Sequence, residues 1–287
     1  MKTKCLIVLW FCFSYLHAQI FEKTILSGRV QDEQQNALAY VNIGIPGTTI
    51  GTVSSETGDY RLVLKNSIKN LDSIQFSMIG YESKIFSVKD LMIQNEERAS
   101  NIILAQAEFD LTEIIVRSKS GQKKTIGHSK TSPQRIVNFS IKNKENQNLG
   151  AEIGKKFKLP KVSTQLNRFE FFVKQNNFDT IRVRINVYEL KKNRPSKNLL
   201  KENILIELTN QKTGWIEVDL NPYDIITEKK VMVSIEWIHY SQKGKYLTLP
   251  LTFPKLGSTH FYKYGSQSKW KRFKGMSTAM RLQYTVY

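Results

Sequence analysis

Hydrophobic and polar residues alternate in short runs along most of the chain, a pattern typical of β-strands with one buried face. Before residue 117, runs such as Ala39–Ile45 make every second residue apolar, and polar turns such as Asp32–Asn36 separate them. Gly58 lies in a further turn that needs a permissive backbone. The pattern predicts about seven strands, ending with Glu113–Val116, and no helix of three turns. We therefore expect an antiparallel β-sandwich over residues 20–117.

The alternation resumes in longer runs after residue 135. In Thr180–Leu190, the residues Ile181, Val183 and Ile185 share one face, opposite Arg182 and Arg184. Comparable runs follow the same pattern: Asn167–Lys174, Ile204–Leu208, Trp215–Leu220, Val231–Tyr240, Tyr246–Phe253 and Ala279–Tyr287. Eight or nine strands predict a larger, jelly-roll-like antiparallel β-sandwich over residues 135–287, and so an all-β protein. Residues 118–134 hold Gly, Ser and Lys with only Ile126 apolar, which predicts a basic linker.

Several motifs of the first part occur in a characteristic order. They are Gly28-x-Val30-x-Asp32, Leu38-Ala39-x-Val41-x-Ile43, Gly47-Thr48-x-x-Gly51-Thr52, Gly58-x-Tyr60 and Asp72-x-Ile74-x-Phe76-Ser77-x-Ile79-Gly80-Tyr81. This series resembles the carboxypeptidase-regulatory-like domain. The resemblance implies a seven-stranded prealbumin-type sandwich with no peptidase chemistry of its own, found as an accessory module in envelope proteins of Gram-negative bacteria. Asn36-Ala37 and Ser55 depart from the family's usual proline and aspartate, so the geometry of those turns is open to question.

The second part has a weaker resemblance. It is similar to the C-terminal β-domain that accompanies regulatory-like modules in exported proteins. The similarity rests on Phe178-Asp179-x-Ile181-x-x-Arg184-Ile185-Asn186-x-Tyr188 and on Gly214-Trp215-x-x-Val218-Asp219-Leu220.

The first residues have the features of a secretory signal peptide. A basic start, Met1–Lys4, precedes the apolar stretch Cys5–Leu16, and the small residue Ala18 follows. The stretch is too short to span a bilayer as a helix. We therefore expect a signal peptide over residues 1–19, export to the periplasm, outer membrane or cell surface, and no transmembrane segment after its removal. Both cysteines, Cys5 and Cys12, would be removed with it, which leaves no thiol for a disulfide, a metal or a nucleophile.

The chain is strongly basic, with a formal net charge of +18. Positive residues concentrate in clusters, among them 117–144, 155–158, 191–194 and 269–274. Such clusters bind nucleic acid, anionic lipid headgroups or acidic polysaccharide, or else form a solvated surface. Of these three partners, nucleic acid is the least accessible to an exported protein, so we expect no nucleic-acid partner.

Motifs of catalysis and metal binding are absent. After signal removal three histidines remain, His128, His239 and His260, and none belongs to a zinc-peptidase, Gly-x-Ser-x-Gly or phosphate-loop motif. We expect a non-enzymatic protein with no catalytic residue, no metal site and no cofactor. A carbohydrate-active enzyme remains the alternative, with an acid pair drawn from scattered strand carboxylates. Those candidates are Glu170, Glu189, Glu207, Glu217, Asp219 and Glu236.

Aromatic residues give the sequence its best candidate binding site. Trp237 shares its parity with apolar neighbours and is expected in the core, whereas Trp215 lies on the opposite face from Ile216 and Trp270 is surrounded by lysines. Sugar rings stack on aromatic planes. The proposed glycan platform consists of Trp215, Tyr262, Tyr264 and Trp270.

The function predicted from these features is binding. We expect an exported accessory module of the envelope that binds a surface partner, either an acidic glycan or an envelope protein. A small outer-membrane barrel is the less favoured alternative. Tyr287 supplies its terminal aromatic residue, but the apolar positions Tyr284 and Val286 have the wrong register for it.

Overall fold

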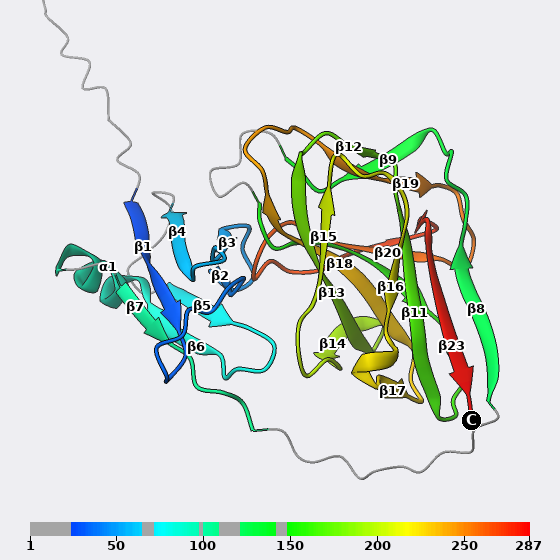
Figure 1. Ribbon diagram of the computed structural model, residues 1–287, viewed down its shortest axis with the longest axis horizontal. Coiled ribbons are helices and arrows are strands. Elements are labelled where there is room, and N and C mark those ends of the chain that lie inside the picture. The colour runs from blue at the N-terminus through cyan, green and yellow to red at the C-terminus, as the bar shows by residue number, and fades with distance from the viewer. Residues whose placement is uncertain (1–23, 65–71, 98–99, 109–120, 142–147) are drawn as a thin grey trace, which may run out of the picture.

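The computed structural model describes residues 24–64, 72–97, 100–108, 121–141 and 148–287. The predicted signal peptide and the predicted strand Glu113–Val116 lie outside these ranges. Within them the protein is almost entirely β, as expected, and it forms a small N-terminal sandwich and a larger second sandwich (Figure 1). The described residues contain no helix long and apolar enough to cross a bilayer.

Two facing sheets build the N-terminal sandwich. One has the strand order β4-β1-β7 and the other β3-β2-β5-β6. Their bounds are β1 (Thr24–Gln31), β2 (Asn42–Gly44), β3 (Gly51–Val53), β4 (Asp59–Leu64), β5 (Ser73–Ser77), β6 (Lys84–Ser87) and β7 (Ser100–Ile103). The alternating apolar residues point between the sheets, so that Val30, Ile43, Leu62 and Phe76 are fully buried. The predicted half-buried strands are confirmed.

Two features of this sandwich differ from the prediction. The pairing of β1 with β7 is parallel, so the sandwich is not purely antiparallel. A helix, α1 (Val88–Glu97), also joins β6 to β7. The Ser87 hydroxyl accepts a hydrogen bond from the backbone N–H of Asp90, as an N-cap does, and Val88 and Leu91 are buried against the core.

Both turns that depart from the family pattern are closed by other groups. The Asp32 carboxylate accepts hydrogen bonds from the backbone N–H groups of Gln34 and Asn36, at 2.9 and 2.8 Å. The Ser55 hydroxyl accepts one from the N–H of Asp59, at 3.1 Å. A serine thus takes the acceptor role usually filled by aspartate. A side-chain acceptor therefore closes each turn.

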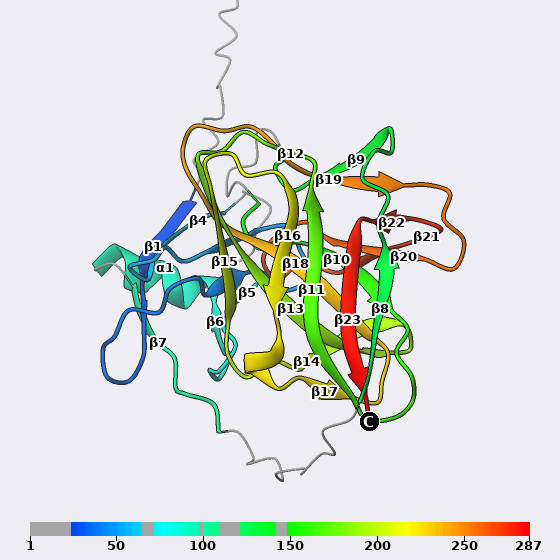
Figure 2. The same cartoon turned by 45° about the vertical axis from the view of Figure 1, so that its right-hand side comes forward.

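The second sandwich packs a seven-stranded sheet against a five-stranded one, with a four-stranded sheet over one end (Figure 2). The seven-stranded sheet has the order β14-β13-β18-β10-β20-β21, with β15 also paired to β13. Its bounds are β10 (Ala151–Phe157), β13 (Thr180–Lys191), β14 (Arg194–Asn198), β15 (Ile204–Thr209), β18 (Val231–Tyr240), β20 (Thr259–Lys263) and β21 (Lys271–Lys274).

The other two sheets complete this sandwich. The five-stranded sheet has the order β16-β11-β23-β8, with β17 paired to β11. Its bounds are β8 (Gln122–His128), β11 (Thr164–Val173), β16 (Gly214–Asp219), β17 (Ile226–Thr227) and β23 (Met280–Val286). The four-stranded sheet contains β9 (Arg135–Asn138), β12 (Gln175–Asn176), β19 (Leu247–Thr252) and β22 (Ser277–Thr278). A single 3₁₀ turn, η1 (Asn221–Tyr223), follows β16.

The linker prediction is wrong for part of its range. Residues 122–128 form β8, which pairs with β23 over seven register positions, from Met280 opposite His128 to Val286 opposite Gln122. The strand adds an edge to the five-stranded sheet, so only one side chain, that of Ile126, needs to face the core. Lysines on an edge strand discourage pairing with other molecules, and this accounts for a strand with a linker-like composition.

Candidate binding site between the two sandwiches

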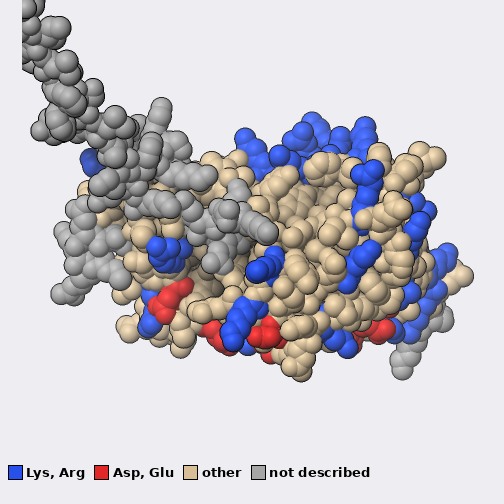
Figure 3. All heavy atoms as spheres, turned by 90° about the horizontal axis from the view of Figure 1, so that it is seen from above, with Lys and Arg blue, Asp and Glu red and all other residues tan. Residues whose placement is uncertain are grey.

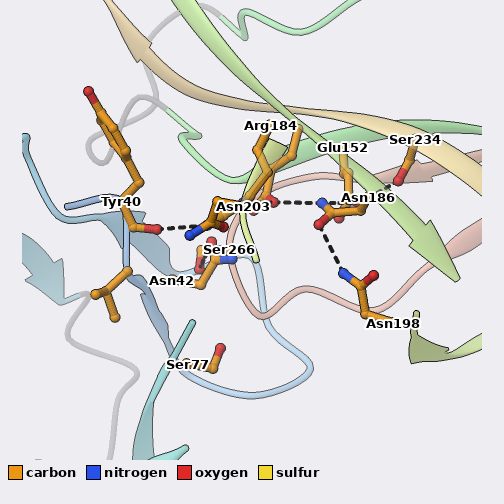
Figure 4. A network of polar contacts seen from close by, with 12 residues as sticks. Tyr40, Asn42, Ser77, Glu152, Arg184, Asn186, Asn198, Asn203, Ser234 and Ser266 are labelled. Atoms are coloured by element: carbon orange, nitrogen blue, oxygen red, sulfur yellow. Dashed lines mark hydrogen bonds and ion pairs between the residues drawn. The ribbon is translucent and has the colours of Figure 1, made fainter. Parts of the chain in front are cut away.

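The N-terminal sandwich packs on the outer face of the seven-stranded sheet. Tyr40 and Val53 form a small buried cluster with Ile238 of β18, which is 1% exposed although it points away from the core of its own sandwich. The backbone of Tyr40 has φ 63°, a left-handed conformation that is strained for a bulky residue. In this conformation the Tyr40 carbonyl accepts a hydrogen bond from Arg184 Nη1 at 3.0 Å (Figure 4).

One loop of the second sandwich, residues 265–268, makes further polar contacts with the N-terminal sandwich. Ser266 Oγ donates to Asn42 Oδ1 at 3.0 Å, and Gln267 Nε2 donates to Ser77 Oγ at 2.7 Å. The approach is so close that a Cβ at Gly51 would lie 2.4 Å from the Ser266 carbonyl oxygen. A glycine of the family motif is therefore required by a contact with the other sandwich.

Four charged side chains lie buried under this contact. They are Glu152, Arg184, Glu236 and Lys263, on the neighbouring strands β10, β13, β18 and β20. The strand register gathers them, because Glu236 lies opposite both Glu152 and Arg184, and Glu152 lies opposite Lys263. All four alternate with core residues and so point to the outer face of the sheet. Two carboxylates thus face two cations, and the cluster carries no net charge.

Ion pairs and amide groups connect the cluster. Arg184 Nε lies 2.9 Å from Glu236 Oε2, and Lys263 Nζ lies 2.6 Å from Glu152 Oε2. The Asn186 amide donates to both carboxylates, at 2.9 Å to Glu152 and 2.8 Å to Glu236 (Figure 4). Arg184 Nη2 and Glu236 Oε1 are buried without a hydrogen-bond partner in the described structure. The cluster thus retains one donor and one acceptor for further contacts.

These contacts determine the protonation states. Burial alone would raise the pKa of Glu236, but the charges of Arg184 and Lys263 outweigh it and lower the pKa to about 2. Burial also opposes the charge on Lys263, yet Glu152 and Glu236 raise its pKa. Burial, followed by the same two carboxylates, raises the pKa of the Tyr188 hydroxyl well above its usual value. Arg184, Glu236 and Lys263 are therefore ionised at neutral pH.

A pocket of about 420 Å³ opens between the sandwiches above this cluster. The N-terminal sandwich contributes residues of β2 and of the segment 77–83, and the second sandwich contributes residues of β13, β14 and β18. The polar lining includes Asn42, Ser77, Ser83, Arg184, Asn186, Tyr188, Ser196, Asn198 and Glu236, and the apolar lining includes Met78, Ile79 and Leu200. Neither sandwich alone contains the whole site.

The four aromatic residues of the predicted platform are divided between two places. Trp215 lies half-buried on the five-stranded sheet, with the Arg281 guanidinium 4.0 Å from its ring centre. Tyr262, Tyr264 and Trp270 belong to β20 and the segment after it. The platform is therefore not one surface, because Trp215 belongs to the five-stranded sheet and the other three to the seven-stranded sheet and its β20–β21 connection.

Within the second group, only part of each ring is accessible. Tyr262 lies on the core-facing side of β20 and is therefore 6% exposed. Its hydroxyl donates a hydrogen bond to the Asn138 carbonyl. Tyr264 packs on Tyr262 with ring centres 4.6 Å apart, and Trp270 packs edge-on against Tyr188, a pocket residue. A sugar-binding role for Trp215, Tyr264 or Trp270 stays a prediction.

The predicted positions of other residues agree with the structure. Trp237 is buried, as its parity indicated. Of the six candidate acids, Glu236 belongs to the buried cluster, while Glu170, Glu189, Glu207 and Glu217 each form an ion pair with a separate cation. Asp219 accepts hydrogen bonds from the backbone and side chain of Asn221. Among the described residues, Glu152 lies opposite Glu236 and Glu170 lies opposite Glu217 on neighbouring strands. Sequence reasoning missed Glu152.

No local pattern in the sequence indicates the buried cluster. A charged residue on a strand is expected to be solvent-exposed, yet Glu152, Arg184, Glu236 and Lys263 all occupy the same face of neighbouring strands. Only the strand order shows that they meet, and only the packing of the N-terminal sandwich shows that they are covered. The described residues contain no group of three or more His, Cys, Asp or Glu side chains placed to hold a metal ion.

One comparison with known proteins concerns the first sandwich. Residues 26–116 match the family model of the CarboxypepD_reg-like domain. No curated protein matches the chain significantly.

Solved structures give only distant similarities. The chain is 10% identical, with a TM-score of 0.41, to the cysteine protease and lectin-like domains of Cwp84, a surface layer associated protein of Clostridium difficile, covering 92% of this chain and 58% of that one. A structure of infectious bursal disease virus, Gx strain, is 8% identical with a TM-score of 0.30, covering 92% of this chain and 71% of that one. Identities and TM-scores this low assign neither an activity nor a ligand to the chain.

Proposed function

We propose that the protein is a non-enzymatic binding protein of the cell envelope, exported by its N-terminal signal, and that it binds a glycan in the pocket between its two sandwiches. The observation that carries the proposal is the composition of this pocket, in which both sandwiches contribute polar groups above a pre-organised network of buried charges. Amide, hydroxyl and guanidinium groups bind sugar hydroxyls, and a nearby aromatic ring binds the C–H face of a sugar.

The charge balance of the pocket specifies the ligand further. Arg184 and Glu236 neutralise each other at its floor, and the lining contains no other charged side chain. A charged ligand would gain no net attraction there. A neutral saccharide replaces its hydrogen bonds to water with hydrogen bonds to the polar lining, and its C–H groups pack against Tyr188 and Leu200. A neutral sugar therefore fits this pocket better than an acidic one.

The same network argues for binding rather than hydrolysis. A glycosidase needs one carboxyl group whose pKa is raised so that it donates a proton near neutral pH. In the Glu152–Glu236 pair, Arg184 and Lys263 lower the pKa of Glu236 instead. Both carboxylates also accept a hydrogen bond from the Asn186 amide. The pair is built to hold the sheet face in place, and we assign it a structural role under the pocket.

A blocking substitution at the mouth of the pocket tests the proposal. Ser196 lines the pocket and is exposed, so Ser196→Trp fills the entrance without disturbing a buried contact. We expect glycans retained by the full chain on an array to be lost with Ser196→Trp and kept with the control Ser129→Trp, at an exposed serine outside the pocket. Retention by both variants would exclude this pocket as the site, and turnover of a bound saccharide would exclude the non-enzymatic function.

A further inference from the structure

A second hollow lies on the outer edge of the seven-stranded sheet and has a different chemistry. It has a volume of about 480 Å³ and lies beside the loop that joins β19 to β20. Three cations line it, Lys156, Arg272 and Lys274, together with Leu256 and Phe261, and its lining includes no acidic side chain. It therefore combines positive charge with an apolar wall.

Among the described residues, none of the three cations that line this hollow forms an ion pair with an acid. After Glu236 the chain contains no Asp or Glu and nine Lys or Arg, of which Lys263 and Arg281 pair with the earlier acids Glu152 and Glu170. Burial lowers the pKa of Lys156, and the charges of Lys158, Lys230 and Arg272 lower it further, as expected where cations crowd without a counter-charge. The Lys156 ammonium donates a hydrogen bond to the neutral side-chain amide oxygen of Asn193 at 3.1 Å. An anion would relieve this repulsion.

Apolar side chains project from the same region. Leu256 is 93% exposed, the highest value among the large hydrophobic residues of the described chain. Phe253 lies on the same loop and is 45% exposed, and Ile136 on the neighbouring strand β9 is 44% exposed. Isolated exposed hydrophobic residues are common, but three on adjacent segments beside a group of lysines form a mixed surface.

The loop that carries Leu256 is held in place by its backbone. The N–H of Lys255 donates to the Gly275 carbonyl at 2.7 Å, and the N–H of Gly275 donates to the Ser258 carbonyl at 3.1 Å. These bonds fasten the loop to the end of β21. Leu256 is thus presented to solvent by a defined turn, next to Lys255.

The position of this surface leaves it accessible. The loop between β19 and β20 lies at the end of the second sandwich that is remote from the N-terminal sandwich, in both ribbon views (Figures 1 and 2). The space-filling view shows Lys and Arg gathered along one edge and one end of the larger body, while the visible Asp and Glu lie along the opposite edge (Figure 3). One side of the molecule is therefore positive.

We propose that this surface, formed by Lys156, Phe253, Lys255, Leu256, Arg272 and Lys274, docks the protein on an anionic lipid membrane. The cations contact phosphate-bearing headgroups, and Leu256 with Phe253 enters the region where headgroups meet acyl chains. An acidic polysaccharide offers the same charges but no apolar phase, so it would leave Leu256 in water. The exposed leucine therefore favours a membrane. This surface is separate from the pocket between the sandwiches, which remains open to its ligand when the membrane is bound.

Vesicle binding tests the proposal. The test protein is the chain from residue 20 onward, which keeps every described residue and lacks the apolar stretch Cys5–Leu16 that would itself bind lipid. We expect it to sediment with vesicles of phosphatidylcholine and phosphatidylglycerol and not with phosphatidylcholine alone. Arg272→Gln with Lys274→Gln should weaken this binding about thirtyfold, since each cation near an anionic surface contributes about fivefold. Leu256→Ser should weaken it about tenfold, and its effect should persist at high salt.

Matched controls and competitors make the outcome decisive. Lys212→Gln with Lys243→Gln removes two exposed cations elsewhere, and Leu205→Ser changes an exposed leucine on β15, so both controls should bind as the unmodified chain does. Soluble inorganic phosphate and dextran sulfate serve as competitors without acyl chains. Equal loss in the controls, or unchanged binding after Leu256→Ser, would overturn membrane docking. Retention on immobilised dextran sulfate without vesicle binding would overturn it in favour of an acidic polymer.

Discussion

At the scale of single residues, the second sandwich contains an unpaired buried lysine. Lys155 is 4% exposed, and its ammonium donates to the Ser277 hydroxyl. Burial lowers its pKa to about 8, and the charge of Lys255 contributes to the shift. No carboxylate pairs with it among the described residues. A lysine in this setting is costly to keep charged, so the stability of the fold should depend on its titration.

Lys155 should make the stability of the fold depend on pH. Its folded pKa of about 8 lies below the usual value of 10.5, so the unfolded chain binds more protons between these two pH values. The free energy of unfolding should therefore rise as pH increases from 8 to 10.5, by about 3 kcal/mol at most. Lys155→Met should abolish this rise in urea unfolding experiments, whereas Lys158→Met, at an exposed position, should keep it. An unchanged rise in Lys155→Met would show that another group causes it.

His260 should give a dependence of the same sign at lower pH. It is buried opposite Lys155, and burial followed by the Lys155 charge lowers its pKa to about 4. Because the folded value lies below the usual value of 6.5, the neutral form stabilises the fold above pH 6.5, and this contribution is lost as pH falls toward 4. His260→Gln should flatten the decrease in unfolding free energy over that range. A histidine NMR titration showing a normal pKa for His260 would refute this.

At the scale of elements, the alternation of apolar and polar residues predicted the core strands well and the edge strand β8 poorly. Core strands such as Thr180–Lys191 are recognised because their apolar residues repeat every second position. The edge strand β8 has one side to bury and carries lysines and a glycine, so its composition matches that of a linker. The helix α1 was missed because Val88–Glu97 is short and weakly amphipathic. The signal that was available is the N-cap Ser87.

The status of β8 is testable at Gly127. Gly127 has φ 138°, and a Cβ there would lie 2.2 Å from the Met280 carbonyl oxygen of β23. Gly127→Ala should therefore lower the free energy of unfolding by about 2 kcal/mol or more, because strain and a backbone clash add. Ser129→Ala, two residues further on and outside any strand, serves as the control and should change it little. Equal stability of the two variants would indicate that the segment is a linker after all.

At the scale of the whole molecule, the site depends on how the two sandwiches meet. Family motifs in the sequence predicted the first sandwich, and parity predicted the core of the second. The pocket between them combines residues from 42 to 236, and no local pattern indicates that segments so distant in sequence share one cavity. Candidate sites judged by exposure on isolated strands therefore omitted Glu152 and Arg184, since charges on a strand face become buried only when another domain covers them.

The contact between the sandwiches should make unfolding cooperative across the whole chain. Ile238 is buried in a small cluster with Tyr40 and Val53 of the N-terminal sandwich, and the buried charges beneath would be costly to expose separately. Tyr40→Gly removes the ring from this cluster while relieving the left-handed backbone at φ 63°. The N-terminal sandwich should therefore stay folded but pack less tightly on the second sandwich. We expect the single calorimetric transition of the unmodified chain to split into two.

Gln35 supplies the matched control for this last prediction. It too has a left-handed backbone, with φ 65°, but it lies in an exposed turn of the N-terminal sandwich and forms backbone hydrogen bonds with Asp32 and with the Gln31 side chain. Gln35→Gly relieves the same kind of strain without touching the contact between the sandwiches, so its transition should remain single. If Tyr40→Gly also keeps one transition, the ring does not couple the sandwiches and the polar contacts of Ser266 and Gln267 suffice. If Gln35→Gly splits the transition as well, backbone strain rather than contact sets the cooperativity.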